Sequence, residues 1–194
     1  MKQSVGAKTL AMPTPVWLVG SYDGEGRPNI MTIAWGGICC TQPPCVTVSL
    51  RRATYSYAAI EARRAFTVSI PSVEQAAEAD YAGIVSGRDA DKFAACGWTP
   101  VRSDLVDAPY VAEAPLVVEC RLIHTLEIGL HTQFVGEIVD VKADPAVVGE
   151  KGYPDITKVR PFVWDPAHRR YLGLGAPLGT AWVMGKKIEA EGAK

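Results

Sequence analysis

The sequence lacks an excess of charge of either sign. Its 194 residues include 20 Lys and Arg against 21 Asp and Glu, which gives a formal net charge of −1. Proteins that bind nucleic acid or an anionic membrane surface usually concentrate basic residues for that purpose. The balance gives no reason to expect either partner, so we predict that the protein binds neither nucleic acid nor a membrane.

Long apolar runs are also missing. No stretch approaches the roughly 20 residues that a membrane-spanning helix needs. Thr and Pro interrupt the apolar stretches of residues 1–20, so we predict no signal peptide. The chain is 48% hydrophobic, which is typical of a folded protein, and its length suits one globular domain. We expect residues 1–194 to form a single domain in the cytoplasm.

Motifs that bind metals or activate nucleophiles are absent too. There is no GxSxG motif, and His124, His131 and His168 lack the spacing of metal ligands. These absences argue against a hydrolase, and we predict no metal site.

The five cysteines are odd in number, and three of them fall within the stretch CCTQPPC. In a chain without a signal peptide, reduced thiols are the expected state. Adjacent cysteines chelate one ion poorly, so small buried side chains at a strand end are the favoured interpretation. One exposed cysteine near a cofactor is the alternative. The role of the three stays open; the five are Cys39, Cys40, Cys45, Cys96 and Cys120.

Short β-like segments separated by turns dominate what is present. Predicted strands cover residues 15–23, 29–38, 43–50, 65–71, 116–129 and 131–144. Predicted helices are few and short, over residues 54–64, 72–83 and 86–97. A doubly wound parallel sheet would need a helix after nearly every strand. The pattern instead predicts a mainly β fold, a closed antiparallel barrel with helices packed outside.

The stretch SLRRATYS, residues 49–56, places two cations and several hydroxyls where a strand gives way to a helix. The first turn of a helix has unpaired N–H groups and a dipole that favours negative charge, so phosphates often bind there. Arg51 can add a two-pronged contact, and the hydroxyls of Thr54, Tyr55 and Ser56 add donors. A capped helix with solvated arginines is the alternative.

Two further stretches favour a bound ligand. NIMTIAWGG, residues 29–37, ends in Trp35 and two glycines, which let a backbone approach a flat ring closely. SGRDADKF, residues 86–93, places Lys92 just after a glycine-containing loop. The alternatives are a core tryptophan, a β-bulge and a surface lysine.

Taken together and in order, these stretches resemble the flavin-reductase-like proteins that have an FMN-binding split barrel. Within that family the likeness is to the flavoredoxins, FMN proteins that transfer electrons. The resemblance implies a six-stranded antiparallel Greek-key split barrel, and a homodimer with one FMN per subunit near the interface. The matching motifs are GAKTLAMPTPVWLVG, GRPNIMTIAWGGICC, PPCVTVSLRRATYS, FTVSIPS, DYAGIVSGRDADKF, SDLVDAPY and LIHTLEIGLHTQFVGEI.

The same resemblance implies a set of cofactor-binding residues. Residues 32–35 correspond to the edge of the isoalloxazine ring, residues 49–56 to the phosphate and ribityl chain, and Trp164 to an aromatic cover. A satisfied strand-end histidine is the alternative for His131. The residues carried over are Asn29, Thr32, Ile33, Ala34, Trp35, Ser49, Leu50, Arg51, Arg52, Thr54, Ser56, Lys92, His131 and Trp164.

One departure from the family pattern bears on function. Reductases that use nicotinamide often have Gly-Asp-His where this chain has Gly129, Leu130 and His131. The missing acid favours an electron carrier that acts with a redox partner protein. The redox chemistry would be that of the flavin, so no catalytic side chain is predicted. An NAD(P)H-dependent flavin or metal-chelate reductase and a non-redox ligand-binding module are the alternatives.

Overall fold

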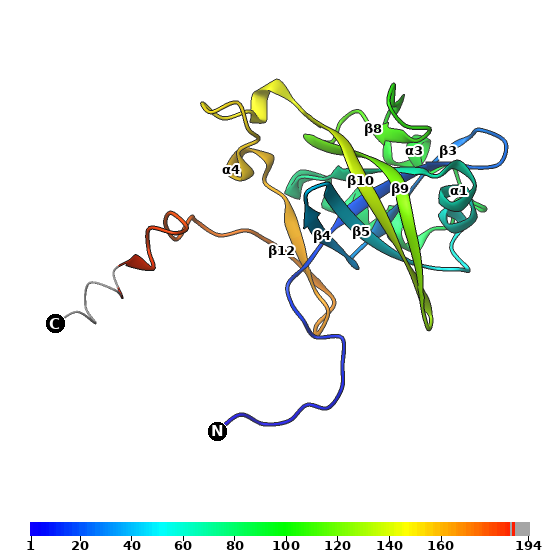
Figure 1. The fold of residues 1–194 in the computed structure, drawn as a ribbon. Helices are drawn as coiled ribbons and strands as arrows, with labels where there is room; N and C mark the ends of the chain where they lie inside the picture. Colours follow the sequence, from blue (N-terminus) through cyan, green and yellow to red (C-terminus); the bar gives the residue numbers. More distant parts are fainter. Residues whose placement is uncertain (187, 189–194) are drawn as a thin grey trace.

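The structure is a computed structural model that describes residues 1–186 and residue 188. One large sheet in the order β3-β2-β6-β9-β10-β5-β4 carries most of the chain, and its neighbouring strands are antiparallel. Short helices lie outside the sheet (Figure 1). The strands are β2 (Trp17–Tyr22), β3 (Pro28–Ile33), β4 (Gly36–Thr41), β5 (Pro44–Arg51), β6 (Ala65–Ile70), β9 (Leu116–Ile128) and β10 (His131–Ala143).

The sheet has seven strands, so the predicted number of six was wrong. The reason lies between β3 and β4, which only Ala34 and Trp35 separate. The chain bends there, leaves its neighbour β2 and pairs with β5 instead. In the bend the Trp35 carbonyl accepts a hydrogen bond from the Ser49 amide, with N···O at 2.8 Å. One continuous segment therefore supplies both ends of the sheet and is divided into two strands.

The remaining strand predictions agree with the structure to within about two residues at each end. Helix α1 (Tyr55–Arg63) lies within its predicted range, α2 (Ala76–Ile84) ends one residue beyond the predicted range of 72–83, and η1 (Val73–Gln75) precedes α2. The third predicted helix was too long, because residues 86–91 form a loop and α3 (Lys92–Cys96) begins only after it. The Asp91 carboxylate accepts a hydrogen bond from the Ala94 amide at 3.1 Å and starts that helix.

Buried residues form two clusters on opposite faces of the sheet. Val19, Val48 and Phe134 belong to the interior of the barrel. Leu18 and Ile30 belong to a second cluster, against α2 and α3. Successive residues of a strand point to opposite faces, so β2 contributes to both clusters and is buried on both sides. β3, which leads into the predicted ring contacts, likewise contributes Ile33 to the first cluster and Ile30 to the second.

Smaller elements complete the fold. Strands β1 (Thr14–Pro15), β11 (Phe162–Asp165) and β12 (Arg170–Gly173) form a separate sheet, and β7 (Pro100–Arg102) pairs with β8 (Pro109–Val111). Two more short helices, η2 (Pro145–Val147) and α4 (Ile156–Val159), follow β10. Residues 1–13 and 174–186 run away from the barrel (Figure 1). None of the helices in the described part of the chain is long and apolar enough to cross a membrane.

The cysteines are free thiols, and only part of the interpretation of CCTQPPC was right. Cys45 is buried, as expected for a small side chain in a strand. Cys39 and Cys40 are exposed, because they lie on β4 at the end of the sheet order.

Candidate functional site

A cavity of about 250 Å³, which we call the α1 cavity, opens at the first turn of α1. Its wall combines β3, the residues that begin α1, the end of α2 and the loop before α3. Four of the predicted site residues line it: Asn29, Thr54, Ser56 and Lys92. Sequence segments about 60 residues apart therefore meet at one helix N-terminus, where unpaired backbone N–H groups favour an anion.

Asn29 and Ser56 connect β3 to α1 at the base of this cavity. The Asn29 side-chain amide donates a hydrogen bond to Ser56 Oγ at 2.8 Å, and both side chains are buried. This bond leaves the hydrogen of the Ser56 hydroxyl for another acceptor. Thr54 stands at the N-cap position, but its hydroxyl donates to the Arg51 carbonyl at 2.8 Å and does not cap the helix. The first-turn N–H groups of α1 thus have no side-chain cap from Thr54.

Lys92 is a buried cation in the wall of the α1 cavity. Its residue surface is only 4% exposed, and its ammonium group donates to the Ala82 carbonyl at 2.8 Å. Among the residues that the structure describes, no carboxylate forms an ion pair with it. Burial lowers the pKa of Lys92 to about 8. Because a buried charge without a counter-charge is costly, this position fits an anionic ligand.

The loop of residues 86–88 closes the cavity and was only partly recognised from the sequence. A Cβ at Gly87 would clash with Asn29 Oδ1 and would lie 2.6 Å from Tyr55 Cδ1, so only glycine fits there. The Arg88 guanidinium lies over the Tyr55 ring, 5.4 Å from its centroid, and donates to the Ala53 carbonyl at 3.2 Å. The motif SGRDADKF contains both residues, but only Lys92 was singled out.

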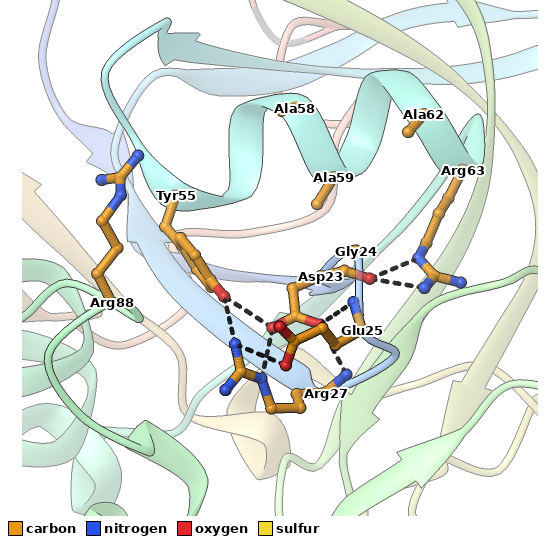
Figure 2. Close-up of a pocket in the computed structure, with 10 residues that line it drawn as sticks. All are labelled: Asp23, Gly24, Glu25, Arg27, Tyr55, Ala58, Ala59, Ala62, Arg63 and Arg88. Carbon is orange, nitrogen blue, oxygen red and sulfur yellow. Dashed lines mark hydrogen bonds and ion pairs between the residues drawn. The ribbon is translucent and has the colours of Figure 1, made fainter.

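A second, larger cavity of about 550 Å³ adjoins Tyr55 and is drawn in Figure 2. The Asp23 carboxylate accepts hydrogen bonds from the Tyr55 hydroxyl at 2.7 Å, from Arg27 Nε at 2.8 Å, and from the amides of Glu25 and Arg27. Arg63 in turn donates to the Asp23 carbonyl at 2.6 Å (Figure 2). These polar groups bind one another, so we interpret the cluster as a brace that ties α1 to the β2–β3 turn.

The pKa of Asp23 reflects this brace. Burial raises that pKa, but hydrogen bonds from Tyr55 and Arg27 outweigh burial and hold it well below its usual range. The carboxylate therefore stays ionised, and Tyr55 stays beside the α1 cavity. The sequence turn DGEGRP gave no sign of this role, because it depends on a residue 32 positions away in the chain.

Other predicted residues gather on the outer face of the sheet. Arg51 lies directly opposite His131 across β5 and β10, and Ser49 lies opposite Gln133. The Trp35 ring meets the Trp164 ring edge to face, with centroids 5.8 Å apart. Strand residues two apart share a face, so these polar and aromatic groups continue from the bend at Trp35 across β5 to β10.

The remaining predicted residues do not expose their side chains to this face or to the α1 cavity. Ile33 and Leu50 are buried in the barrel interior. The Thr32 hydroxyl donates to the Ala79 carbonyl of α2. Arg52 pairs with Glu127 and does not line the cavity. Ile33, Thr32 and Leu50 could therefore meet a ligand only through the backbone, and the cations in the cavity wall are Lys92 and Arg88.

The two groups of residues lie near opposite ends of β3. Asn29 and Ile33 are four strand residues apart, or about 13 Å at the usual rise of about 3.3 Å per strand residue, and Trp35 follows in the bend after Ile33. An anion site at one end and an aromatic pair at the other fit a ligand that carries a phosphate at one end and a flat ring at the other. The donors of the α1 cavity and the glycine loop thus fit the phosphate of a flavin nucleotide.

The sequence matches the flavin reductase like domain family over residues 9–173. The chain belongs to this family. Among solved structures it is similar to the flavoredoxin of Desulfovibrio vulgaris (Miyazaki F), with 55% identity and a TM-score of 0.91 over 95% of this chain and 100% of that one. The predicted membership of the flavin-reductase-like family and the likeness to flavoredoxin are confirmed.

Two further similarities in this family extend the comparison. The NADPH-flavin oxidoreductase of Streptomyces viridifaciens is 30% identical over 134 residues, 68% of each chain. A solved structure from Shewanella frigidimarina described as having a split barrel domain shares the fold, with 19% identity and a TM-score of 0.82 over 94% of this chain and 100% of that one. The fold is therefore a mainly β split barrel, and the family assigns the chain a flavin-associated redox function.

Proposed function

We propose that the protein is an FMN-binding flavoprotein that carries electrons between redox partner proteins. The observation that carries this proposal is the α1 cavity, where the buried ammonium of Lys92 has no carboxylate partner among the described residues. A mononucleotide supplies one terminal phosphate, which matches one anion site at the start of one helix. The 55% identity to a flavoredoxin supports the electron-carrier assignment.

The protein's own groups would position the cofactor and shape its electrostatics. Bound FMN supplies the redox-active ring. Lys92, the Ser56 hydroxyl and the first N–H groups of α1 would neutralise and orient the phosphate. The backbone of residues 32–35 would follow the ring edge, and Trp35 with Trp164 would keep water from one face. None of these groups has to give or take a proton, which suits a carrier.

We further propose a cytoplasmic homodimer whose contact surface includes the outer face of β5, β9 and β10. Three apolar side chains near the tip of the β9–β10 hairpin are exposed: Leu126, Ile128 and Leu130. Exposed apolar groups that lie close together favour a protein contact. They adjoin His131, which is opposite Arg51, so the partner subunit would lie next to the proposed ring site.

A reductase that oxidises NAD(P)H directly is the second candidate. The similarity to an NADPH-flavin oxidoreductase favours it. Leu130 argues against it, because that position is an exposed apolar side chain at the hairpin tip and offers no carboxylate.

The test is an anaerobic absorbance spectrum of the purified protein, taken before and after NADH, NADPH and then dithionite. We expect flavin bands that survive gel filtration, resist both nicotinamides and bleach with dithionite. Bleaching by NADH or NADPH would refute the carrier assignment and establish the reductase. A protein that stays colourless after incubation with FMN, and that does not oxidise NADH or NADPH when FMN is added, would refute both and leave a non-redox binding module.

A further inference from the structure

Cys40 and Cys45 face each other across the hairpin that joins β4 to β5. The two residues are direct partners in the antiparallel register, and only Thr41, Gln42, Pro43 and Pro44 separate them in the chain. Opposed residues of an antiparallel pair have Cα atoms about 4.5 or 5.5 Å apart, depending on their hydrogen bonding. Both values lie within the range of about 4.4–6.8 Å that disulfides require. The register therefore permits a bond between these two sulfurs.

The neighbouring Cys39 does not share this position. The register shifts between Ile38 and Cys40, so Cys39 has no direct partner on β5. Cys96 and Cys120 lie elsewhere, on α3 and in the barrel interior. Of the five cysteines, only Cys40 and Cys45 are paired by the fold.

The two thiols differ in their access to solvent. Cys40 is exposed, whereas Cys45 is only 3% exposed. Burial raises the pKa of Cys45, and the nearby Cys39 and Cys40 raise it further. An external reagent can therefore reach the exposed Cys39 and Cys40, but only Cys40 lies opposite Cys45, and Cys45 reacts only with a sulfur that is already held next to it.

We propose that Cys40 and Cys45 form a thiol–disulfide exchange site for low-molecular-weight disulfides. The Cys40 thiolate attacks one sulfur of the external disulfide, forms a mixed disulfide and releases the first thiol. Cys45 then loses its proton to solvent and attacks Cys40 Sγ, which releases the second thiol. Two protein thiols are oxidised to one disulfide, and the external disulfide is reduced to two thiols. Excess dithiol reverses both steps.

The experiment treats the purified, flavin-loaded chain with oxidised glutathione, alkylates the remaining thiols under denaturing conditions and measures intact mass and peptide masses. We expect the link to remove two of the five alkylatable thiols, those of Cys40 and Cys45. The peptides should show a Cys40–Cys45 link with no glutathione on either residue, and dithiothreitol should restore all five thiols. A wild-type chain that keeps a stable glutathione adduct on Cys40, or in which Cys40 and Cys45 stay unmodified, would overturn the proposal.

Three variants separate the roles. Cys45→Ser removes the resolving thiol, so Cys40 should retain one glutathione. Cys40→Ser should leave Cys45 unmodified, because Cys45 is buried. Cys39→Ser is the matched control and should form the same internal link as the wild type. Loss of the link in Cys39→Ser, or its persistence in Cys40→Ser, would assign the site to other residues and overturn the proposal. Thiol counting does not depend on the flavin, so this outcome is independent of the proposed function.

Discussion

Replacing Lys92 with Met should weaken FMN binding while leaving the empty protein at least as stable. Met keeps an unbranched side chain of similar length in the wall of the α1 cavity and removes the ammonium group. Hydrogen bonds to charged groups contribute about 1.5–3 kcal/mol. Since about 1.4 kcal/mol corresponds to a factor of ten in affinity, we expect FMN to bind about 10- to 150-fold more weakly.

The empty protein should respond in the opposite direction. Burial lowers the pKa of Lys92 from 10.5 to about 8, and this difference corresponds to about 3 kcal/mol of unfavourable charge burial. Met has no charge to bury. The free energy of unfolding of the Lys92→Met variant without FMN should therefore equal or exceed that of the wild type near pH 7.

The pH dependence follows from the same pKa. Between about pH 8 and 10.5 the unfolded chain keeps the Lys92 proton and the folded chain loses it. Stability rises with pH wherever the unfolded state binds more protons, so the wild type without FMN should gain stability across this window relative to the variant. FMN binding needs the ammonium form, so affinity should fall as pH rises above about 8.

The measurements are fluorescence titrations of FMN between pH 7 and 9.5 and urea unfolding of the protein without FMN at the same pH values. Lys158→Met is the matched control, because Lys158 also donates to a backbone carbonyl, that of Val148 at 3.1 Å, but is exposed. If Lys92→Met bound FMN as tightly as the control and kept the pH dependence of the wild type, the assignment of Lys92 to the phosphate would be refuted.

Two further predictions concern the loop and the brace. Gly87→Ala would place a methyl group against Asn29 and Tyr55, so we expect about 1–3 kcal/mol lower stability by urea unfolding and weaker FMN binding. Gly24→Ala is the control, because its Cβ would meet nothing within 4 Å; equal effects of the two would contradict the clash. Asp23→Asn should lower the melting temperature near pH 7. Because the pKa of Asp23 is depressed, its contribution to the stability of the wild type is present above about pH 4 and is lost on acidification. The variant should not show this acid-dependent loss of stability. If the two proteins lost stability identically on acidification, the brace would be ruled out.

Strands and hairpins could be predicted from the sequence because their signals are local. Alternating apolar residues and turn residues fix the ends of β9 and β10 without reference to the rest of the chain. The split between β3 and β4 could not be predicted in this way. Residues 29–38 read as one strand, and the bend at Trp35 exists only because the two halves pair with different neighbours.

The position of the candidate site could also be predicted from local sequence signals, but its side-chain contacts could not. The helix N-terminus at residues 54–56 follows from a strand, hydroxyl residues and a helix in succession, and the structure places a cavity there. The directions of the side chains could not be predicted from the sequence. The Thr32 hydroxyl donates to a carbonyl of α2 and Arg52 pairs with Glu127, and only the fold brings these partners close together. Arg88 reaches the cavity because it lies on the loop that connects α2 to α3. Its contact with the Tyr55 ring could not be predicted from the sequence, because the two residues are far apart in the chain.

Several residues around the α1 cavity depart from common local rules of protein structure. Lys92 holds a charge in a buried position, and Thr54 occupies an N-cap position without capping the helix. Residue 87 is a glycine, because its neighbours leave no room for a side chain. The buried charge and the missing cap are unfavourable for the empty protein, and all three features leave a donor or a space facing the same cavity. Local rules are usually broken at sites that bind something, because the ligand supplies the missing partner. A phosphate would pair with Lys92, accept from the first N–H groups of α1 and pass close to the backbone at Gly87, and so would offset the costs of the buried charge and of the uncapped helix together.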